Sequence, residues 1–372
     1  MRIAAIVGTR PQLIKLAAIR PHLTAPIELS IIDTAQHHDE SLAGQIYRDL
    51  GMAPPDLLLP EPGTLRGSER LEKMLDELSP ALAAERPDAV IVFGDTDSTL
   101  AGARAAMAIG VPVVHIEAGV RSGDLAMPEE RNRIAVDRIA TLRLCTSESA
   151  VQTLRGEGLA DGNLVVGDLM ADLVARLAPD ARSARALEEA SRRLGRTLLS
   201  GGYAYATLHR ADVREAGQLR SALEVLRTSG ARLALPVLFA AHPGTSAAIA
   251  AHGIDVPDGI ELVPPVGYLD SLTLAAQAAA VLTDSGGLQR EAAWLGTPTL
   301  ILRTTTEWPE LLHPAGPSLL IGVDADRVAD ALATLGAVTG AAAVDARSSR
   351  PLPAGGAAEA IRAALIARRF AR

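Results

Sequence analysis

Residues 1–15 read MRIAAIVGTRPQLIK, and the organisation of the whole chain can be worked out from this stretch. The apolar run Arg2–Val7 has the length of a buried strand, and the glycine after it permits a tight turn. Pro11 suits the first turn of a helix, whose free N–H groups stabilise an anion at the sheet edge. Arg10 and Lys15 add positive charge there. The pattern predicts a strand–helix unit of a parallel sheet with an anion site; the alternative is a surface turn with two solvated cations.

Short apolar runs alternate with helical patterns through the first half of the chain, which is the order expected of a parallel, doubly wound sheet. The predicted strands are Arg2–Val7, Ile27–Asp33, Ala89–Phe93, Val111–Ile116 and Leu142–Thr146, followed by a weaker one at Asn163–Val166. Pro11–Leu23 and Thr99–Ile109 carry apolar residues at helical spacing. We expect this first domain to cover residues 1–167.

The same alternation restarts after a helical region, Asp168–Gly202, that is rich in Ala, Arg and Glu. The second set of predicted strands is Tyr203–Leu208, Leu235–Ala241, Ile260–Val263, Ala280–Thr283 and Thr297–Leu302. The repeated order favours two similar α/β domains, the second over residues 168–354. We expect Gly336–Pro353 to be loose and Ala357–Ala371 to form a terminal helix within residues 355–372.

The composition predicts a folded protein that binds neither nucleic acid nor a membrane. The 372 residues are 48 % hydrophobic and 22 % charged, which excludes disorder over the full length. The net charge of −8 and the aromatic content of 2 % argue against a nucleic-acid-binding surface. No apolar run approaches the roughly 20 residues of a membrane-spanning helix. A single cysteine, Cys145, excludes an internal disulfide framework, and we expect a cytoplasmic protein.

Carboxylates stand at or shortly after the ends of predicted strands in the first half. Asp95 follows Ala89–Phe93, Glu117 follows Val111–Ile116, and Glu129 lies at a predicted helix start soon afterwards. Ligands of doubly wound sheets bind at the carboxyl ends of the strands, so these side chains are expected to converge. Adjacent carboxylates push their pKa values apart and can then serve as an acid and a base. A Mg²⁺ site is the competing interpretation, and Asp95 alone could instead cap a helix.

The second half supplies histidines and a phosphate-type turn at its strand ends. His209 and His242 each follow a predicted strand, although a lone histidine is more often packed or solvated than functional. Ser285–Gly287 opens a helix directly after Ala280–Thr283, and such a turn lets backbone N–H groups approach a phosphate. Glu291, one turn into that helix, is placed to reach a pair of ribose hydroxyls. These features together are a moderately specific sequence signal for a nucleotide-binding site.

Several common catalytic motifs are missing from the sequence. It has no Gly-x-Gly-x-x-Gly fingerprint, which disfavours a dinucleotide-dependent oxidoreductase. It also has no Walker A loop, no His-Glu-x-x-His and no Gly-x-Ser-x-Gly elbow, which disfavours a P-loop enzyme, a zinc protease and an α/β-hydrolase.

Taken together, a series of segments in order along the chain resembles the UDP-N-acetylglucosamine 2-epimerases, specifically the non-hydrolysing bacterial type. The segments are Gly8–Lys15, Thr34–His37, Gly94–Thr99, His115–Asp124, Pro128–Arg133, His209-Arg210, Asp284–Glu291 and Thr305–Pro309. The resemblance implies an α/β fold of two Rossmann-like, doubly wound domains facing a cleft, the GT-B-like arrangement, with the C-terminal helix crossing back to the first domain. It also implies an isomerase that needs no cofactor and no metal, binds UDP-N-acetylglucosamine (UDP-GlcNAc) and UDP, and forms a homodimer.

The reaction implied by this resemblance inverts carbon 2 of the sugar and gives UDP-N-acetylmannosamine (UDP-ManNAc). Carbon 2 is not next to a carbonyl, so the implied route breaks the anomeric C–O bond, expels UDP and removes the C2 proton. UDP then adds back to the resulting 2-acetamidoglucal, with protonation from the other face. Such chemistry requires a site that stabilises a diphosphate and places carboxylates about the sugar ring.

The resemblance also assigns roles to individual residues. The implied catalytic residues are Asp95, Glu117, Glu129 and His209. The implied substrate- and UDP-binding residues are Arg10, Lys15, Arg133, His209, Ser285, Gly286, Gly287 and Glu291. The implied residues of a second, activating UDP-GlcNAc site, found in many bacterial members, are Gln36, His37 and His242.

The sequence departs from the family pattern at several points, which leaves the accepted sugar and the activation open. Gln12 and Arg290 stand where the family commonly has glutamate, and the stretch after His37 is altered. Alternative functions are therefore an epimerase of a related UDP-acetamido sugar, such as a 2,3-diacetamido uronic acid, and a hydrolysing 2-epimerase that releases ManNAc and UDP. A GT-B glycosyltransferase and a non-catalytic nucleotide-sugar sensor are further alternatives.

Overall fold

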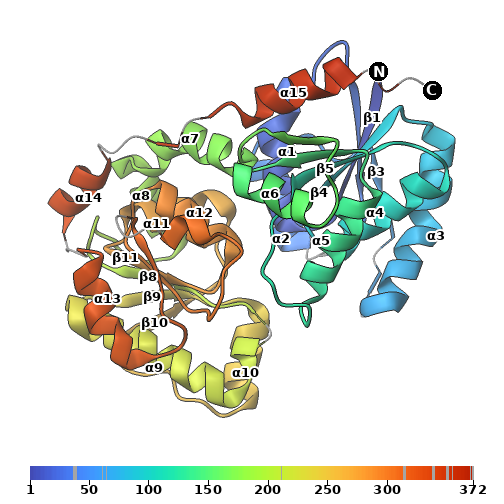
Figure 1. Ribbon diagram of the computed structural model, residues 1–372. Coiled ribbons are helices and arrows are strands. Elements are labelled where there is room, and N and C mark those ends of the chain that lie inside the picture. Colours follow the sequence, from blue (N-terminus) through green and yellow to red (C-terminus); the bar gives the residue numbers. More distant parts are fainter. Residues whose placement is uncertain are drawn as a thin grey trace. The chain divides into compact units, whose positions relative to one another are not determined.

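The computed structural model describes residues 1–36, 40–60, 62–63, 65–210, 212–312, 316–336, 340–348, 352–353, 355–368 and 370. The chain divides into two compact units (Figure 1). The first unit comprises Met1–Leu173 together with Ala354–Arg372, and the second comprises Val174–Pro353. Each unit is a parallel sheet with helices between successive strands, as expected for Rossmann-like domains.

The first unit contains a seven-stranded parallel sheet in the order β3-β2-β1-β4-β5-β6-β7. Its strands are β1 (Arg2–Val7), β2 (Glu28–Asp33), β3 (Leu57–Leu58), β4 (Ala89–Phe93), β5 (Val113–Ala118), β6 (Leu142–Cys145) and β7 (Asn163–Val165). Its helices are α1 (Arg10–Ile19), α2 (Glu40–Asp49), α3 (Gly67–Glu85), α4 (Asp97–Ala108), α5 (Pro128–Ile139), α6 (Glu148–Gly156) and α15 (Ala357–Arg368), with a 3₁₀ turn at Arg20–His22. The strand order reverses between β1 and β4, which makes that point the expected ligand crevice.

The second unit contains a six-stranded parallel sheet in the order β10-β9-β8-β11-β12-β13, and its order reverses between β8 and β11. Its strands are β8 (Ala204–Thr207), β9 (Val237–Ala240), β10 (Ile260–Val263), β11 (Ala280–Thr283), β12 (Thr299–Ile301) and β13 (Ser318–Leu320). Its helices are α8 (Ala184–Arg193), α9 (Ala216–Leu233), α10 (Pro243–Ala251), α11 (Tyr268–Gln277), α12 (Gly286–Trp294), α13 (Val328–Thr334) and α14 (Ala341–Ser348). Short 3₁₀ turns lie at Asp212–Arg214, Pro309–Leu312 and Ala325–Arg327, and α7 (Leu169–Ala181) begins in the first unit and ends in the second.

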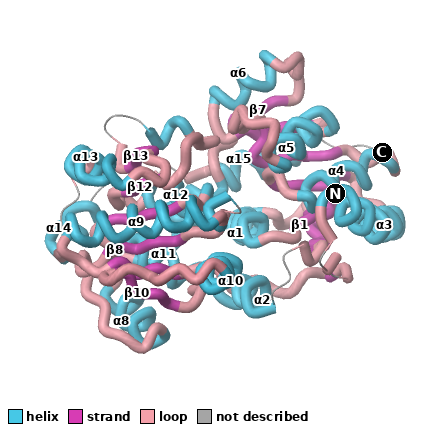
Figure 2. The backbone as a smooth tube through the Cα atoms, turned by 90° about the horizontal axis from the view of Figure 1, so that it is seen from below, coloured by secondary structure: helices cyan, strands magenta, loops and turns pink. Residues whose placement is uncertain are grey.

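Burial on both faces explains why the central strands read as unbroken apolar runs. All five residues of β4 are buried, and so are the last five of β1. In the second unit, the side chains of alternate residues point to opposite faces of the sheet. Ala204 and Ala206 pack into the core formed with α9 and α13. Tyr203 and Tyr205 pack into the core formed with α8 and α11. Figure 2 shows strands with helices on either side in each unit.

Some sequence predictions were wrong at the edges of elements. The two edge strands β3 and β13 were missed, because two or three residues carry no alternating pattern. The strand expected at Val111–Ile116 is β5, Val113–Ala118, since Pro112 has no N–H to donate to the sheet. Gly336–Pro353, expected to be loose, contains α14.

The terminal helix α15 is attached to the first unit by its amino end. The Asp172 carboxylate accepts hydrogen bonds from the backbone N–H groups of Gly356, Ala357 and Ala358, at 3.1, 3.3 and 2.8 Å. Farther along the helix, Arg362 donates to the Ala25 carbonyl at 3.1 Å. A side chain of the first unit therefore satisfies the free N–H groups at the start of α15.

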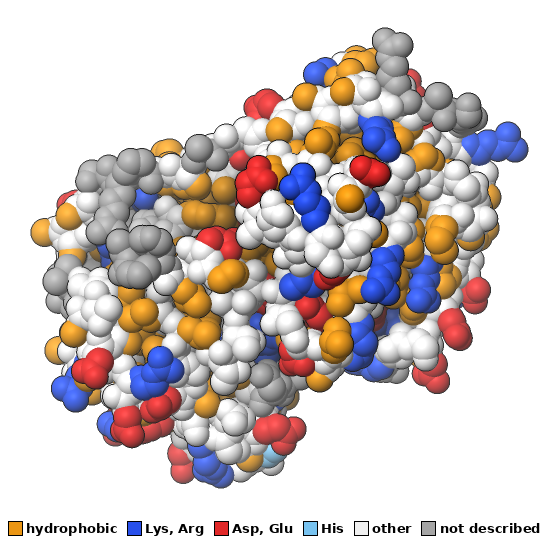
Figure 3. All heavy atoms as spheres, in the orientation of Figure 1, with side chains coloured by type: hydrophobic (Ala, Val, Ile, Leu, Met, Phe, Trp, Pro, Cys, Tyr) orange, Lys and Arg blue, Asp and Glu red, His pale blue; other side chains and the backbone are white. Residues whose placement is uncertain are grey.

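On the face shown in Figure 3, basic and acidic side chains are interspersed. Among the described residues, no helix is both long enough and apolar enough to cross a membrane.

Candidate functional site

The turn between β1 and α1 is built tightly and leaves no room for a side chain at Gly8. A Cβ there would lie 2.0 Å from Thr34 Oγ1, so only glycine fits. Thr9 caps α1, and its N–H donates to Gln12 Oε1 at 3.1 Å. The Gln12 amide in turn donates to the Phe93 carbonyl at 3.1 Å. Gln12 thus joins the turn after β1 to the turn after β4, on the two sides of the point where the strand order reverses.

Lys15 and Glu117 form a buried ion pair at this edge of the sheet. Lys15 Nζ lies 2.8 Å from Glu117 Oε1. Glu117 occupies a bulge of β5 at φ = 70°, the left-handed region that residues other than glycine rarely adopt. Gly94 lies against the pair, because a Cβ on it would be 3.2 Å from Lys15 Nζ and 3.3 Å from Glu117 Oε1. Strained backbone held by the surrounding structure is frequent at functional sites.

Asp95 faces a guanidinium group. Its carboxylate, 25 % exposed, forms an ion pair with Arg133 Nη2, and Arg133 Nη1 also lies 3.3 Å from Glu130. The helix-capping alternative for Asp95 is wrong, because Thr96 is the N-cap of α4 and accepts from Thr99 N–H. Asp95 therefore does not cap α4, and its partly exposed carboxylate faces Arg133.

The two adjacent glutamates at the start of α5 have different environments. Glu129 is exposed in the first helical turn. Glu130 is buried and accepts hydrogen bonds from the Ser122 and Gly123 N–H groups at 2.9 and 3.0 Å. Glu130 thus fixes the loop after β5, while Glu129 remains accessible.

The residues implied for a second ligand site are only partly described. Gln36 accepts from Ser98 N–H and Ser98 Oγ at 2.8 and 2.6 Å, which ties it to the start of α4. His37 lies outside the described residues. His242 is the exposed N-cap of α10, and its Nδ1 accepts from Gly244 N–H at 3.1 Å.

In the second unit, His209 is fixed by a buried carboxylate. Its Nδ1 lies 3.0 Å from Asp284 Oδ1, and the N–H groups of His209 and Arg210 also donate to Asp284. Burial raises the pKa of Asp284, but these partners outweigh it and hold that pKa below its usual value. Asp284 therefore stays ionised and orients the His209 ring through Nδ1.

The segment directly after β11 forms the predicted helix start. Ser285 caps α12, its Oγ accepting from Leu288 N–H at 3.2 Å, and Gly286 and Gly287 form the first turn of the helix. These three residues are half-buried, whereas Glu291, in the next turn, is buried. His209 and Ser285 follow β8 and β11, the two strands at which the order of the second sheet reverses.

A loop after β12 is attached to α12 through Arg290. The Arg290 guanidinium lies 3.8 Å from the Trp308 ring centroid and 5.9 Å from that of Trp294. The same loop contains a buried two-point pair, with Arg303 Nη1 and Nη2 at 2.7 and 2.8 Å from the Glu307 carboxylate. Arg290 thus makes a cation–π contact with Trp308.

Two of the candidate carboxylates of the first unit are each paired with a cation, Glu117 with Lys15 and Asp95 with Arg133. Within the described part of the chain, no group of three or more His, Cys, Asp or Glu side chains is arranged to hold a metal ion.

The chain is similar to known proteins over nearly its full length. The model of the family described as UDP-N-acetylglucosamine 2-epimerase matches residues 22–366. The chain belongs to this family. The UDP-2,3-diacetamido-2,3-dideoxy-D-glucuronate 2-epimerase of Pseudomonas aeruginosa is 36 % identical, over 90 % of this chain and 92 % of the relative. The UDP-N-acetylglucosamine 2-epimerase of Escherichia coli K12 is 30 % identical, over 90 % of each chain.

A solved structure supports the same assignment. The crystal structure of the Methanocaldococcus jannaschii UDP-GlcNAc 2-epimerase, in complex with UDP-GlcNAc and UDP, has a TM-score of 0.86 and 30 % identity, covering 99 % of this epimerase and 100 % of that chain. The expected family and the expected fold of two Rossmann-like domains are confirmed, and the protein is an isomerase.

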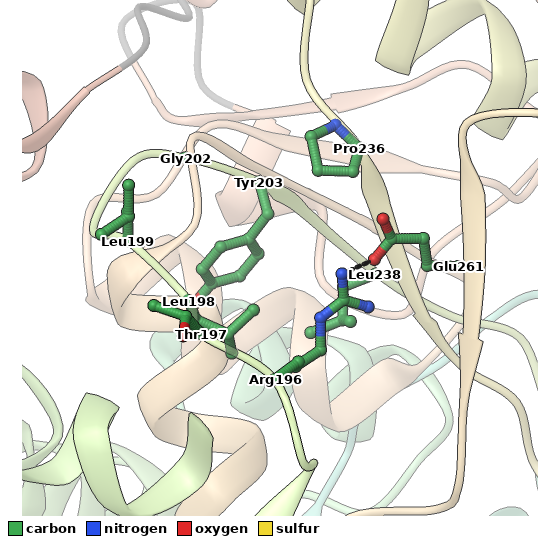
Figure 4. Close-up of a pocket in the computed structure, with 9 residues that line it drawn as sticks. All are labelled: Arg196, Thr197, Leu198, Leu199, Gly202, Tyr203, Pro236, Leu238 and Glu261. Carbon is green, nitrogen blue, oxygen red and sulfur yellow. Dashed lines mark ion pairs between the residues drawn. The ribbon is translucent and has the colours of Figure 1, made fainter. Parts of the chain in front are cut away.

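A small cavity in the epimerase lies away from these residues. It has a volume of about 120 Å³ and is lined by residues at the amino ends of β8, β9 and β10, among them Tyr203 and Pro236 (Figure 4). His209 and Ser285 lie at the opposite, carboxyl ends of the strands. Ligands of such sheets bind at the carboxyl ends, so this cavity is not the nucleotide site.

Sequence reasoning named Arg133 as a binding residue but overlooked two other buried polar residues of α5, Glu130 and Asp137. All three are buried and recur at helical spacing, so they share one face of that helix. The sequence could have revealed them, because charged residues recur in α5 at the spacing where an amphipathic helix normally has apolar residues.

Proposed function

We propose that this epimerase interconverts UDP-GlcNAc and UDP-ManNAc by eliminating UDP and adding it back. The anomeric C–O bond breaks and its electron pair leaves with UDP, while a carboxylate takes the C2 proton and the C1–C2 double bond of 2-acetamidoglucal forms. On return, a UDP oxygen bonds to C1 and a proton reaches C2 from the opposite face. The product differs from the substrate only in configuration at C2.

The buried Lys15–Glu117 pair is the observation that carries this proposal. Glu117 is held in a strained backbone conformation at the carboxyl edge of the sheet, with a cation 2.8 Å away. A cation beside a carboxylate suits a reaction in which a proton leaves carbon while a diphosphate leaves oxygen. We assign acid/base roles to Asp95, Glu117 and Glu129, and to His209 a role in catalysis and in binding the diphosphate.

The nucleotide contacts are assigned to both units. Arg10, Lys15 and Arg133 supply positive charge from the first unit. The start of α12 supplies the N–H groups of Ser285, Gly286 and Gly287 for the diphosphate. Glu291 is assigned to the ribose. The protein is proposed to act as a homodimer.

Proton NMR of UDP-GlcNAc incubated with the enzyme in D₂O tests the reaction. We expect UDP-ManNAc with deuterium at C2, because C–H cleavage exchanges that proton with solvent. Free ManNAc and UDP would instead identify a hydrolysing enzyme. Sugar transfer only when an acceptor is added would identify a glycosyltransferase.

A UDP-2,3-diacetamido uronic acid is the second candidate substrate. It is favoured by the similarity to the P. aeruginosa relative, which is 36 % identical. Comparison of kcat/KM on the two nucleotide sugars decides between them. A higher value for UDP-GlcNAc is expected.

A further inference from the structure

A buried histidine–aspartate pair lies directly behind the proposed acid/base residues. His115 is on β5 and Asp137 is on α5, and both side chains are completely buried. His115 Nδ1 lies 2.7 Å from Asp137 Oδ1, and Nε2 lies 2.7 Å from the Gly94 carbonyl oxygen. The ring therefore spans from the turn after β4 to helix α5.

The partners of this ring fix the role of Nε2. A carbonyl oxygen only accepts, so Nε2–H donates to Gly94. Asp137 also accepts from Gly119 N–H at 3.2 Å and from Arg121 Nη2 at 2.7 Å. Burial raises the pKa of Asp137, but the interactions with His115 and Arg121 outweigh burial, so that pKa is lowered. Asp137 is thus held as a carboxylate against the Nδ1 side of the ring.

This network joins the backbone segments that carry the proposed catalytic carboxylates. Gly94 immediately precedes Asp95, and Gly119 comes two residues after Glu117. Helix α5, which carries Asp137, also carries Glu129. One hydrogen-bonded pair therefore fixes three otherwise separate segments relative to one another within the first unit.

Movement of the Gly94 peptide would be transmitted to the reactive groups. Lys15 Nζ and Glu117 Oε1 occupy the space beside its Cα, since a Cβ at Gly94 would lie 3.2 and 3.3 Å from them. The His115 Nε2–H bond to the Gly94 carbonyl holds that peptide in place. A displacement of about 1 Å at reacting groups can cost on the order of 100-fold in rate.

We propose that His115 and Asp137 are positioning residues, which hold the Gly94–Asp95 turn and the segment after Glu117 in the geometry required for proton transfer at C2. Both side chains are completely buried, so they would act on the reaction only through the groups that they hold. The proposal rests on the epimerase function assigned above.

Matched variants of this network test the proposal. In Asp137→Asn, the ionised acceptor of the ring is lost, and we expect kcat for C2 deuterium exchange to fall about 100-fold. UDP affinity, measured by calorimetry, should change less than twofold.

Glu157→Gln is the control, since Glu157 is the other acidic partner of Arg121, at 2.8 Å and nearer the surface. It should retain wild-type kcat. An Asp137→Asn enzyme with wild-type kcat, or an equal loss of kcat in both variants, would overturn the proposal.

NMR of the unmodified protein labelled with ¹⁵N-histidine provides a readout that does not depend on turnover. We expect one histidine, identified by its loss in His115→Phe, to carry a proton on Nε2 that is protected from exchange with solvent, because it donates to the Gly94 carbonyl in the interior. A bare Nε2 would overturn the proposed arrangement. Absence of turnover on every UDP-acetamido sugar in the wild type would reject the proposed function instead, which the NMR result distinguishes.

Discussion

Lys15 Nζ lies 2.8 Å from Glu117 Oε1 in a pair whose side chains are only 5 % and 6 % exposed. Burying two charges is costly, and such pairs seldom stabilise a fold more than apolar residues of the same size would. Their presence at the carboxyl edge of the sheet, next to the point where the strand order reverses, is therefore better explained by function than by stability.

Removal of one member should be more harmful than removal of both. We expect Lys15→Met to lower the free energy of unfolding by about 3 kcal/mol, because it leaves Glu117 buried without its cation. The double variant Lys15→Met/Glu117→Leu should recover part of that loss. Urea unfolding of the two single variants and the double variant measures the coupling, and purely additive losses would contradict it. All of them should lack epimerase activity.

Glu117→Gln should separate binding from chemistry. The amide keeps the shape of the side chain but cannot take a proton, so we expect turnover to fall by at least about 100-fold. UDP affinity should remain near that of the wild type. Asp97→Asn is the control, since Asp97 lies at the same sheet edge but is engaged with Arg70 and Asn132. Full activity in Glu117→Gln would remove Glu117 from the acid/base set.

Asp284 should make the second unit sensitive to acid. Its pKa is lowered in the folded protein, so its stabilising contribution is complete above the ordinary aspartate value of about 4. That contribution is lost as pH falls through the lowered value. We expect the unfolding free energy to fall less steeply between pH 5 and pH 3 in Asp284→Asn than in the wild type. Asp258→Asn, an exposed aspartate in the same unit, should retain the wild-type slope.

Tryptophan fluorescence should detect a change at Arg290 directly, because the chain has two tryptophans and Arg290 lies near both rings. We expect Arg290→Leu to change the tryptophan emission and to cost about 1 kcal/mol of stability through the lost cation–π contact. UDP binding should weaken as the loop that carries Trp308 moves away from α12. Arg290→Lys keeps a cation over the ring and should restore part of the affinity. Equal affinities in Leu and Lys variants would show that the contact does not support the nucleotide site.

The sequence patterns predicted the central architecture well, because buried parallel strands are continuous apolar runs of distinctive length. The carboxyl-edge residues were also predictable, since topology places Asp95 and Glu117 beside the first strand's turn. The side-chain partners of these residues were not predictable. Nothing in the sequence says that Glu117 meets Lys15 or that His115 meets Asp137, because these contacts depend on the three-dimensional packing of segments far apart in the chain. Two-residue strands such as β3 carry too little pattern to be recognised.

The attachment of α15 by Asp172 has a consequence for the order in which the protein folds. The first unit is discontinuous in sequence: α15 is separated from the other elements of its unit by all of Val174–Pro353. During synthesis, the second unit emerges whole before the helix that completes the first. The first unit therefore cannot be completed until the residues around Gly356 have been synthesised. Until then, the Asp172 carboxylate and the surface that α15 covers are exposed to solvent. A released chain truncated after Pro353 would carry the whole second unit and lack the helix that completes the first.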